Sequence, residues 1–301
     1  MIKEEITFEG KFKELLENYP LGERTIYGYS PNEIEFEYWY LFNSEVLNLT
    51  PKTFAKVVEL IRSNKGIQRV VGIYILHAKN CDSVYKKETL QLYFELLDKP
   101  QSDAVLHALF GALSYYAKYF NTEQLIKLTT YKTVDNIELK SDFISMLCIA
   151  EHEIAVDCII ELTYDPSRII RRSANIGLCI MADCGFPKIR EALWKGVSDP
   201  DEDVKWSAIL GLSEIGDERI IPIIIHHLET ENFHDELFEA ICMLKDEIFV
   251  DVLRNMLTPE ELAKEYEPVQ TCGWRYSLYY TYYELIRLIE QGPINYDYED
   301  E

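Results

Sequence analysis

One acidic stretch, Asp199-Pro-Asp-Glu-Asp203, resembles the first half of a calcium-binding loop, in which carboxylate oxygens coordinate the ion. Such a loop requires glycine at its sixth position and glutamate at its twelfth, where this chain has Val204 and Leu210. Helix capping accounts for the acids better, because carboxylates in the first turn of a helix interact favourably with the helix dipole. The stretch therefore predicts the start of a helix and no calcium site.

Histidines and cysteines are the other side chains that could hold a metal or transfer protons. The pair His152-Glu153 occurs once, and His226, His227 and His234 lack the H-x-x-x-H spacing that puts two ligands on one helix face. The seven cysteines form no C-x-x-C pair. The sequence also contains no G-x-S-x-G, P-loop, G-x-G-x-x-G or H-E-x-x-H motif. We therefore predict no catalytic residues, no metal site and no cofactor, and we expect that the protein is not an enzyme.

The least ordinary group of side chains is a tyrosine cluster near the C-terminal end of the sequence. Tyr276, Tyr279, Tyr280 and Tyr283 share one face if this stretch is helical, whereas Tyr282 is displaced around the axis. Two interpretations stand. The face packs on the preceding repeat, as aromatic side chains usually do, or part of it contacts a partner. Tyrosines beside carboxylates suit an interface that receives arginine or lysine.

The charge of the chain is strongly negative and unevenly distributed. The formal net charge is −22, and residues 199–301 alone carry 25 acidic and 7 basic residues. Such a field repels phosphate backbones and anionic membranes and attracts cationic proteins, although a solubilising role would also explain it. We predict that the partner is a basic protein or peptide, and neither nucleic acid nor a membrane. The predicted contact residues are Glu229, Glu231, Asp235, Glu236, Glu239, Asp246, Glu247 and Asp251, together with Tyr276, Tyr279, Tyr280 and Tyr283.

Length and composition fit a folded protein of the cytoplasm. Hydrophobic residues make up 48% of the 301 residues, enough for a large core. No apolar run reaches the roughly 18 residues that a membrane span requires. The first residues, Met1 to Glu9, are too acidic for a secretory signal peptide. An odd number of scattered cysteines is typical of buried thiols in a reducing compartment.

An internal repeat indicates which elements position these side chains. The stretch from Asp165 to Leu178 aligns without a gap with the stretch from Asp199 to Leu212, which begins 34 residues later. A small residue recurs along the chain at steps of 36, 33, 33, 34 and 32 residues. Periods of this size mark stacked supersecondary units. The recurring positions are Gly72, Ala108, Ser141, Ala174, Ala208 and Ala240.

Each repeat is predicted to be a pair of antiparallel helices. Asp165-Pro166 and Asp199-Pro200 end one element and open the next helix. A second helix follows, in which Ile220, Ile224 and Leu228 have helical spacing. Such a pair cannot bury its apolar face alone, so neighbouring pairs must stack. The predicted fold class is therefore all-α, an α-solenoid of stacked antiparallel helix pairs.

Glycines and boundaries complete the predicted organisation. Gly111, Gly177 and Gly211 each follow the small residue by three positions. Glycine within a helix costs about 1 kcal/mol relative to alanine, so its recurrence predicts a close approach of helices. Three regions are predicted: an irregular helical N-terminal cap at 1–63, a repeat array at 64–257, and a terminal helix with an aromatic face and an acidic tail at 258–301.

Residues 165–257 resemble the HEAT-repeat family, particularly the short repeats of phycobilin-lyase-like proteins, and residues 65–160 match more loosely. In that family an aspartate and an arginine or lysine typically form a ladder between repeats. The resemblance implies a HEAT-like superhelix, and it predicts the fold better than the function because the family contains many scaffolds and a few enzymes. The ladder positions here are Asp165, Arg171, Asp199 and Lys205, with Val105 and Glu138 breaking the pattern earlier in the chain.

The enzymes of this family offer an alternative function. Those resembling deoxyhypusine hydroxylase bind two irons through several His-Glu pairs, whereas this chain has only His152-Glu153. Those resembling alkyl-DNA glycosylases hold DNA in a basic groove, and only the repeat at 164–198 is net basic here.

The preferred prediction is a protein-binding scaffold or adaptor, of the immunity-protein or regulatory kind. Its concave face is predicted to consist of the second helices, and its acidic C-terminal half to engage a basic partner. The alternative is a HEAT-fold enzyme or ligand binder, lyase-like or glycosylase-like, with a concave pocket.

Overall fold

The structure is a computed structural model of the chain, and it describes residues 49–79, 84–230, 232–263 and 278–291. Within these ranges it consists of helices joined by short loops, without strands, and neighbouring helices pack in stacked pairs. The predicted all-α fold of stacked helix pairs is therefore confirmed. None of the helices in the described ranges combines the length and the apolarity needed to cross a membrane. The chain divides between Ala150 and Glu151 into two compact units, a boundary that falls inside the array predicted at 64–257.

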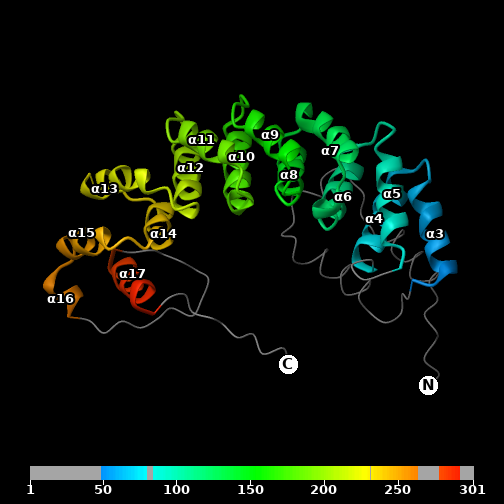
Figure 1. Cartoon of the computed structure of the whole chain (residues 1–301). Helices are drawn as coiled ribbons and strands as arrows, with labels where there is room; N and C mark the ends of the chain where they lie inside the picture. Colours follow the sequence, from blue (N-terminus) through cyan, green and yellow to red (C-terminus); the bar gives the residue numbers. More distant parts are fainter. Residues whose placement is uncertain (1–48, 80–83, 231, 264–277, 292–301) are drawn as a thin grey trace, which may run out of the picture. The chain divides into compact units, whose positions relative to one another are not determined.

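The N-terminal unit contains two rows of helices. α4, α6 and α8 pack against one another in order, α3 packs against α4, and α5 and α7 form the second row (Figure 1). Thr50 caps α3 by accepting a hydrogen bond from the Thr53 backbone N–H at 3.2 Å, and Pro51 occupies the first helical position. Residues 1–48 of the predicted cap lie outside the described part. The helices are α3 Pro51–Ile61, α4 Gly66–Lys79, α5 Lys86–Leu96, α6 Asp103–Ser114, α7 Thr122–Thr129 and α8 Ile137–Leu147, with short 3-10 helices at Ala117–Tyr119 and Thr130–Thr133.

The C-terminal unit is built in the same way. Its inner row consists of α10, α12, α14 and α17, which pack in this order, and its outer row consists of α9, α11, α13 and α15 (Figure 1). The helices are α9 Glu153–Leu162, α10 Arg168–Ile180, α11 Pro187–Gly196, α12 Glu202–Glu214, α13 Ile221–Glu229, α14 Asp235–Leu244, α15 Ile248–Met256, α16 Pro259–Leu262 and α17 Leu278–Gln291, with 3-10 helices at Ala182–Cys184 and Glu218–Ile220.

The inner row lies on the inside of this unit's curve (Figure 1). The concave side is therefore lined by the first helix of each pair, and the prediction that second helices line it is wrong. The physical reason lies in the packing of the two rows. The inner helices α10, α12 and α14 pack on one another more extensively than the outer helices do, so the unit bends toward the inner row. Ala174, Ala208 and Ala240 are fully buried on these inner helices.

The aspartates of the two Asp-Pro pairs form matching turns. Asp165 Oδ1 accepts a hydrogen bond from the Ser167 backbone N–H at 2.8 Å, and Asp199 Oδ1 accepts one from the Asp201 backbone N–H at 2.9 Å. Ser167 and Asp201 are the N-cap residues of α10 and α12. The predicted helix starts are thus confirmed, and at least part of the acidic stretch 199–203 serves this turn.

The glycines of the repeat differ in their surroundings. A Cβ at Gly211 would lie 3.0 Å from both Cδ atoms of Leu193, so α12 packs tightly on α11 there. A Cβ at Gly111 would meet nothing within 4 Å. The predicted close approach is therefore confirmed at Gly211 and wrong at Gly111, which is exposed on α6. In the N-terminal unit a close approach occurs instead at Gly72, where a Cβ would lie 2.6 Å from Ile61 Cγ1.

The terminal helix α17 completes the inner row by packing on α14 and α15. Thr281 and Leu285 are fully buried and Tyr282 is 7% exposed. The buried face of α17 is therefore centred on these residues. Tyr282, which was predicted to be displaced from the packing face, is part of it.

Candidate functional site

Three carboxylates gather on the inner row of the C-terminal unit. Glu214 ends α12, and Glu236 and Glu239 lie in the first half of α14. The pKa of Glu239 is raised above its ordinary value, first by burial and then by the nearby charges of Glu236 and Glu214. Repulsion of this kind requires that the three groups lie close together. We call Glu214, Glu236 and Glu239 the acidic face.

Cations compensate only one member of the acidic face. Glu236 pairs with Arg172 of α10, with 3.6 Å between nitrogen and oxygen, and with His234. Neither Glu214 nor Glu239 forms an ion pair within the described ranges. These two carboxylates therefore give the inner row an uncompensated negative potential.

Two thiols on the inner row respond to the same potential. The pKa of Cys179 on α10 is raised to about 11, first by burial and then by Glu214 and Glu239. The pKa of Cys242 on α14 is raised to about 12, first by burial and then by Glu284 and Glu239. Burial dominates in both cases, and the carboxylates add to it because a negative charge disfavours a thiolate. The effect of the acidic face is therefore felt on both α10 and α14.

The first helix of the inner row, α10, exposes a line of isoleucines. Ile169, Ile176 and Ile180 are 51%, 41% and 60% exposed, and their helical spacing places them on one face. Arg172 lies on this face between them and reaches toward α14, because it pairs with Glu236. The isoleucines therefore adjoin the acidic face. We call Ile169, Ile176 and Ile180 the isoleucine strip.

An aromatic group packs beside the acidic face. The Trp206 ring, 2% exposed, lies 4.6 Å from the His227 ring and 5.4 Å from the His234 ring, which it meets almost parallel. The pKa of His227 is lowered, first by burial and then by His226, which favours the neutral imidazole. Within the described ranges, no group of three or more His, Cys, Asp or Glu side chains is arranged to hold a metal ion.

One rung of the expected ladder forms between repeats of the C-terminal unit. Arg171 Nε and Nη2 donate to Asp199 Oδ2 and Oδ1 at 2.8 and 3.0 Å, and this contact is the main reason that the pKa of Asp199 is lowered. Lys205 pairs with a glutamate of its own helix instead of extending the ladder. Sequence reasoning missed Arg69, which holds the corresponding place in the N-terminal unit and donates to Gln101 Oε1 at 2.6 Å.

The His152-Glu153 pair serves the start of α9. His152 Nδ1 accepts a hydrogen bond from the Ile154 backbone N–H at 3.1 Å, so the histidine caps the helix. Glu153 pairs with Lys188 at 2.9 Å, and Lys188 also pairs with Asp157 at 2.5 Å. Lys188, part of the net-basic repeat, is thereby engaged with acids of the neighbouring repeat.

The remaining predicted acids do not join the acidic face. Glu229 ends the outer helix α13, Glu247 lies before α15, and both are exposed. Asp246 lies just before α15 and accepts a hydrogen bond from the Ile248 backbone N–H at 2.9 Å, and Asp251 pairs with an arginine one turn along its own helix. Glu231 lies outside the described residues, and Asp235 begins α14 without a described side chain. Of the eight predicted acids, the structure brings Glu236 and Glu239 together.

The predicted aromatic contacts are only partly available. Tyr280 is 39% exposed, whereas the Tyr283 hydroxyl donates to the Leu262 carbonyl at 2.9 Å and ties α17 to α16. Tyr276 lies outside the described residues, and the side chain of Tyr279 is not described. The described tyrosines therefore contribute more to packing than to an exposed surface.

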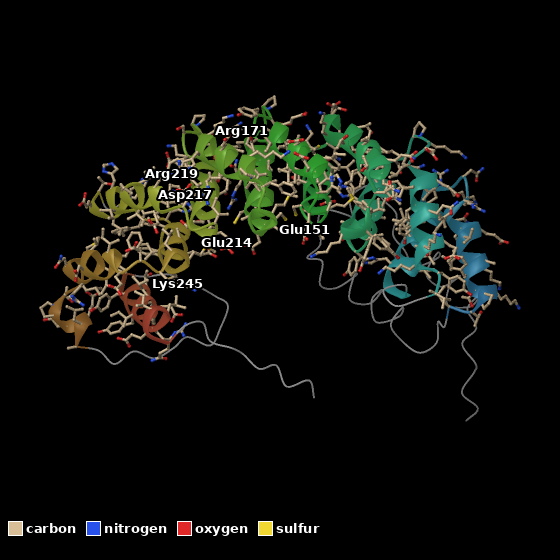
Figure 2. The ribbon with its side chains drawn as sticks, in the orientation of Figure 1. Glu151, Arg171, Glu214, Asp217, Arg219 and Lys245 are labelled. Atoms are coloured by element: carbon tan, nitrogen blue, oxygen red, sulfur yellow. The ribbon has the colours of Figure 1, made fainter. Side chains whose placement is uncertain are left out.

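A hollow of about 850 Å³ lies where the loops that lead into α11 and α13 meet. Beneath it Asp217, 3% exposed, accepts from Trp194 Nε1 and Arg219 Nε, each at 2.8 Å, and Arg219 is the main reason that the pKa of Asp217 is lowered. Asp217 and Arg219 lie side by side, apart from Glu214 (Figure 2). This hollow is therefore at a loop edge and not on the inner row, where the enzyme alternative expects a pocket.

Comparison with known proteins identifies the repeat. Residues 156–258 match the family described as HEAT repeats. These residues are HEAT repeats. The matched range begins within α9 and ends just after α15, so it includes both the acidic face and the isoleucine strip.

Two kinds of relative support the same fold. The chain is 24% identical over 131 residues to Protein YibA of Escherichia coli K12 and of Escherichia coli O157:H7, a match that covers 44% of this chain and 46% of each relative. The matched part thus spans about half the length of these curated relatives. An X-ray structure of Escherichia coli YibA is similar with a TM-score of 0.58 and 16% identity, over 85% of this chain and 92% of that chain. At this identity the likeness establishes the fold.

Two features of the site escaped sequence reasoning. Glu214 was not among the predicted contacts because the acids were chosen by their density between 229 and 251, and Glu214 stands alone at a helix end. The isoleucine strip was missed although a helical projection of α10 separates it from the buried Ile170, Ala174 and Leu178. The sequence signal for the strip was a second line of aliphatic residues along α10. A helix that packs on the core with one face needs only one such apolar line.

Proposed function

We propose that this HEAT-repeat protein is a protein-binding scaffold of the cytoplasm, and not an enzyme, whose C-terminal unit engages a basic partner through its acidic face. The observation that carries the proposal is the pair Glu214 and Glu239, which lie close together on the inner row without a compensating cation. Crowded carboxylates reduce stability, and such local costs are typical of surfaces that are kept for binding. A lysine or arginine from a partner would supply the missing charge.

The mechanism follows from the distribution of charge. Residues 199–301 carry an excess of 18 negative charges, which steers a cationic protein toward this half of the molecule. On contact, the cation meets Glu239, which is already partly desolvated, and this strengthens the attraction compared with a fully exposed pair. Cys148, Cys179 and Cys242 are free thiols, which supports the reducing compartment named in the proposal.

The test compares two variants that change the net charge equally. Glu214→Lys with Glu239→Lys reverses the acidic face, and Glu229→Lys with Glu247→Lys reverses two exposed acids of the predicted footprint that lie outside it. The immobilised full chain is exposed to a cell extract at low and at high salt, the retained protein is purified, and its Kd is measured with each variant. The acidic-face variant is expected to weaken binding by about 2 kcal/mol, and the other by less than about 0.5 kcal/mol.

The outcomes separate the acidic face from bulk charge. Equal weakening by both variants would show that net charge alone attracts the partner, and unchanged binding by the acidic-face variant would refute the proposal. Circular dichroism spectra of both variants establish that the helices remain folded. Release of the partner by salt is expected, because interactions between exposed charges are screened.

A further inference from the structure

The isoleucine strip is an unusual feature of the inner row. The residues 34 positions later on α12 are Asp203, Leu210 and Glu214, so two of the three isoleucines stand where the next repeat has carboxylates. Neighbouring helices of the repeat therefore do not require apolar residues at these places. Several large aliphatic side chains exposed along one helix face are typical of a surface that contacts another molecule.

The strip and the acidic face form one continuous surface. Arg172 stands on α10 between Ile169 and Ile176, and its guanidinium lies 3.6 Å from Glu236 on α14. Going across the inner row, the surface passes from exposed isoleucines on α10 to carboxylates on α12 and α14. One side of this surface is therefore apolar and the other is acidic.

We propose that the segment bound here is a basic amphipathic helix, whose apolar face covers the isoleucine strip and whose lysines or arginines reach Glu214 and Glu239. This inference rests on the proposed function and specifies the chemistry of the partner. A helix suits the surface because the strip runs from Ile169 to Ile180, about 16 Å along α10, which matches roughly three turns of a second helix.

Other occupants fit this surface less well. A purely polar basic tail would reach the carboxylates but leave the isoleucines in water. A purely apolar segment would cover the strip but bury Glu214 and Glu239 without a partner, which is unfavourable for charged groups. Only a segment with both properties satisfies both halves of the surface, and adjacent apolar and cationic stripes arise naturally on a helix.

The test uses three synthetic peptides and the full chain, with binding measured by fluorescence anisotropy. The first is a peptide of about 14 residues with leucine at helical spacing and lysine elsewhere, the second replaces each leucine with glutamine, and the third replaces each lysine with glutamate. The first peptide is expected to bind at least about tenfold more tightly than the second. The reason is that the free energy gained by partly burying three isoleucines corresponds to more than a tenfold gain in affinity. The third is expected not to bind.

Variants of the protein assign the effect to the strip. Replacement of Ile169, Ile176 and Ile180 by glutamine is expected to remove the tenfold preference for the first peptide and to leave the weaker binding of the second unchanged. Ile248→Gln changes an isoleucine that is 49% exposed on the outer helix α15 and is expected to have no effect. The substitutions lie on exposed surface, and glutamine is a good helix former.

The results distinguish this inference from the proposed function. If the first two peptides bind equally and both lose affinity with Glu214→Lys and Glu239→Lys, the acidic face binds cations but the amphipathic helix is refuted. If the preference survives in the triple glutamine variant, the strip is not the contact and the inference is again refuted. If none of the peptides binds, the acidic face does not attract basic segments and both proposals fail.

Discussion

At the scale of single residues, Glu239 shows a conflict between stability and the proposed binding. Its pKa is raised by burial, by Glu236 and by Glu214, so the ionised form is less favourable in the folded than in the unfolded protein. The destabilisation is present at pH values above the folded pKa. It disappears as the pH falls below the unfolded value of about 4.3, because the carboxyl group is then protonated in both states.

Glu239→Gln is therefore expected to stabilise the protein at pH 7 by less than about 1 kcal/mol, since the half-exposed group is partly screened by water. Urea denaturation at pH 7 and near pH 4 measures the difference, which should shrink at the lower pH. Glu229→Gln, at an exposed position on α13, is the control and should change stability little at either pH. A Glu239→Gln protein that is less stable than the wild type at pH 7 would contradict this account.

At the scale of helices, two glycines at the same place in the repeat are expected to respond in opposite ways to alanine. Gly211→Ala puts a Cβ 3.0 Å from Leu193 at a closely packed contact and should destabilise by about 1–3 kcal/mol. Gly111→Ala meets nothing within 4 Å and should stabilise by up to about 1 kcal/mol, because alanine is the better helix former. Thermal denaturation measures the melting temperature of each variant. If both melting temperatures shift in the same direction, the packing beside Gly211 does not exclude a larger side chain.

The same comparison shows what the sequence could and could not predict about the helices. Asp-Pro turns and the recurring alanines predicted the starts and stacking of α10 and α12, because these features act through local chemistry and a fixed period. The direction of curvature was mispredicted, because it depends on how closely two rows of helices pack and not on either row alone. Gly111 was misjudged for a related reason, since sequence shows a small residue but not whether a neighbour fills the space beside it.

At the scale of the whole molecule, the chain repels itself. The net charge of −22 includes carboxylates such as Glu214 and Glu239 that lack an ion-pair partner in the described part of the protein. Raising sodium chloride from about 20 mM to about 300 mM shortens the screening length from about 20 Å to about 6 Å. The melting temperature is therefore expected to rise with salt, as measured by circular dichroism.

The variant Glu214→Gln with Glu239→Gln should show a smaller rise, because it removes two of the repelling charges. A melting temperature that falls with salt would mean that ion pairs such as Arg171–Asp199 outweigh the repulsion. Composition predicted the sign of this field from the sequence. It could not predict the location of the proposed binding surface, because that depends on which helices of the fold carry the acids that remain unpaired.

The thiols of the inner row add a chemical consequence. Cys179 has a pKa of about 11, so at neutral pH only about one molecule in ten thousand carries the nucleophilic thiolate. Peroxides and alkylating agents react with the thiolate, and the site is therefore protected from them without a disulfide or a metal. Burial is the main reason that this sulfur is inert, and the glutamates that would attract a cationic partner add to the protection.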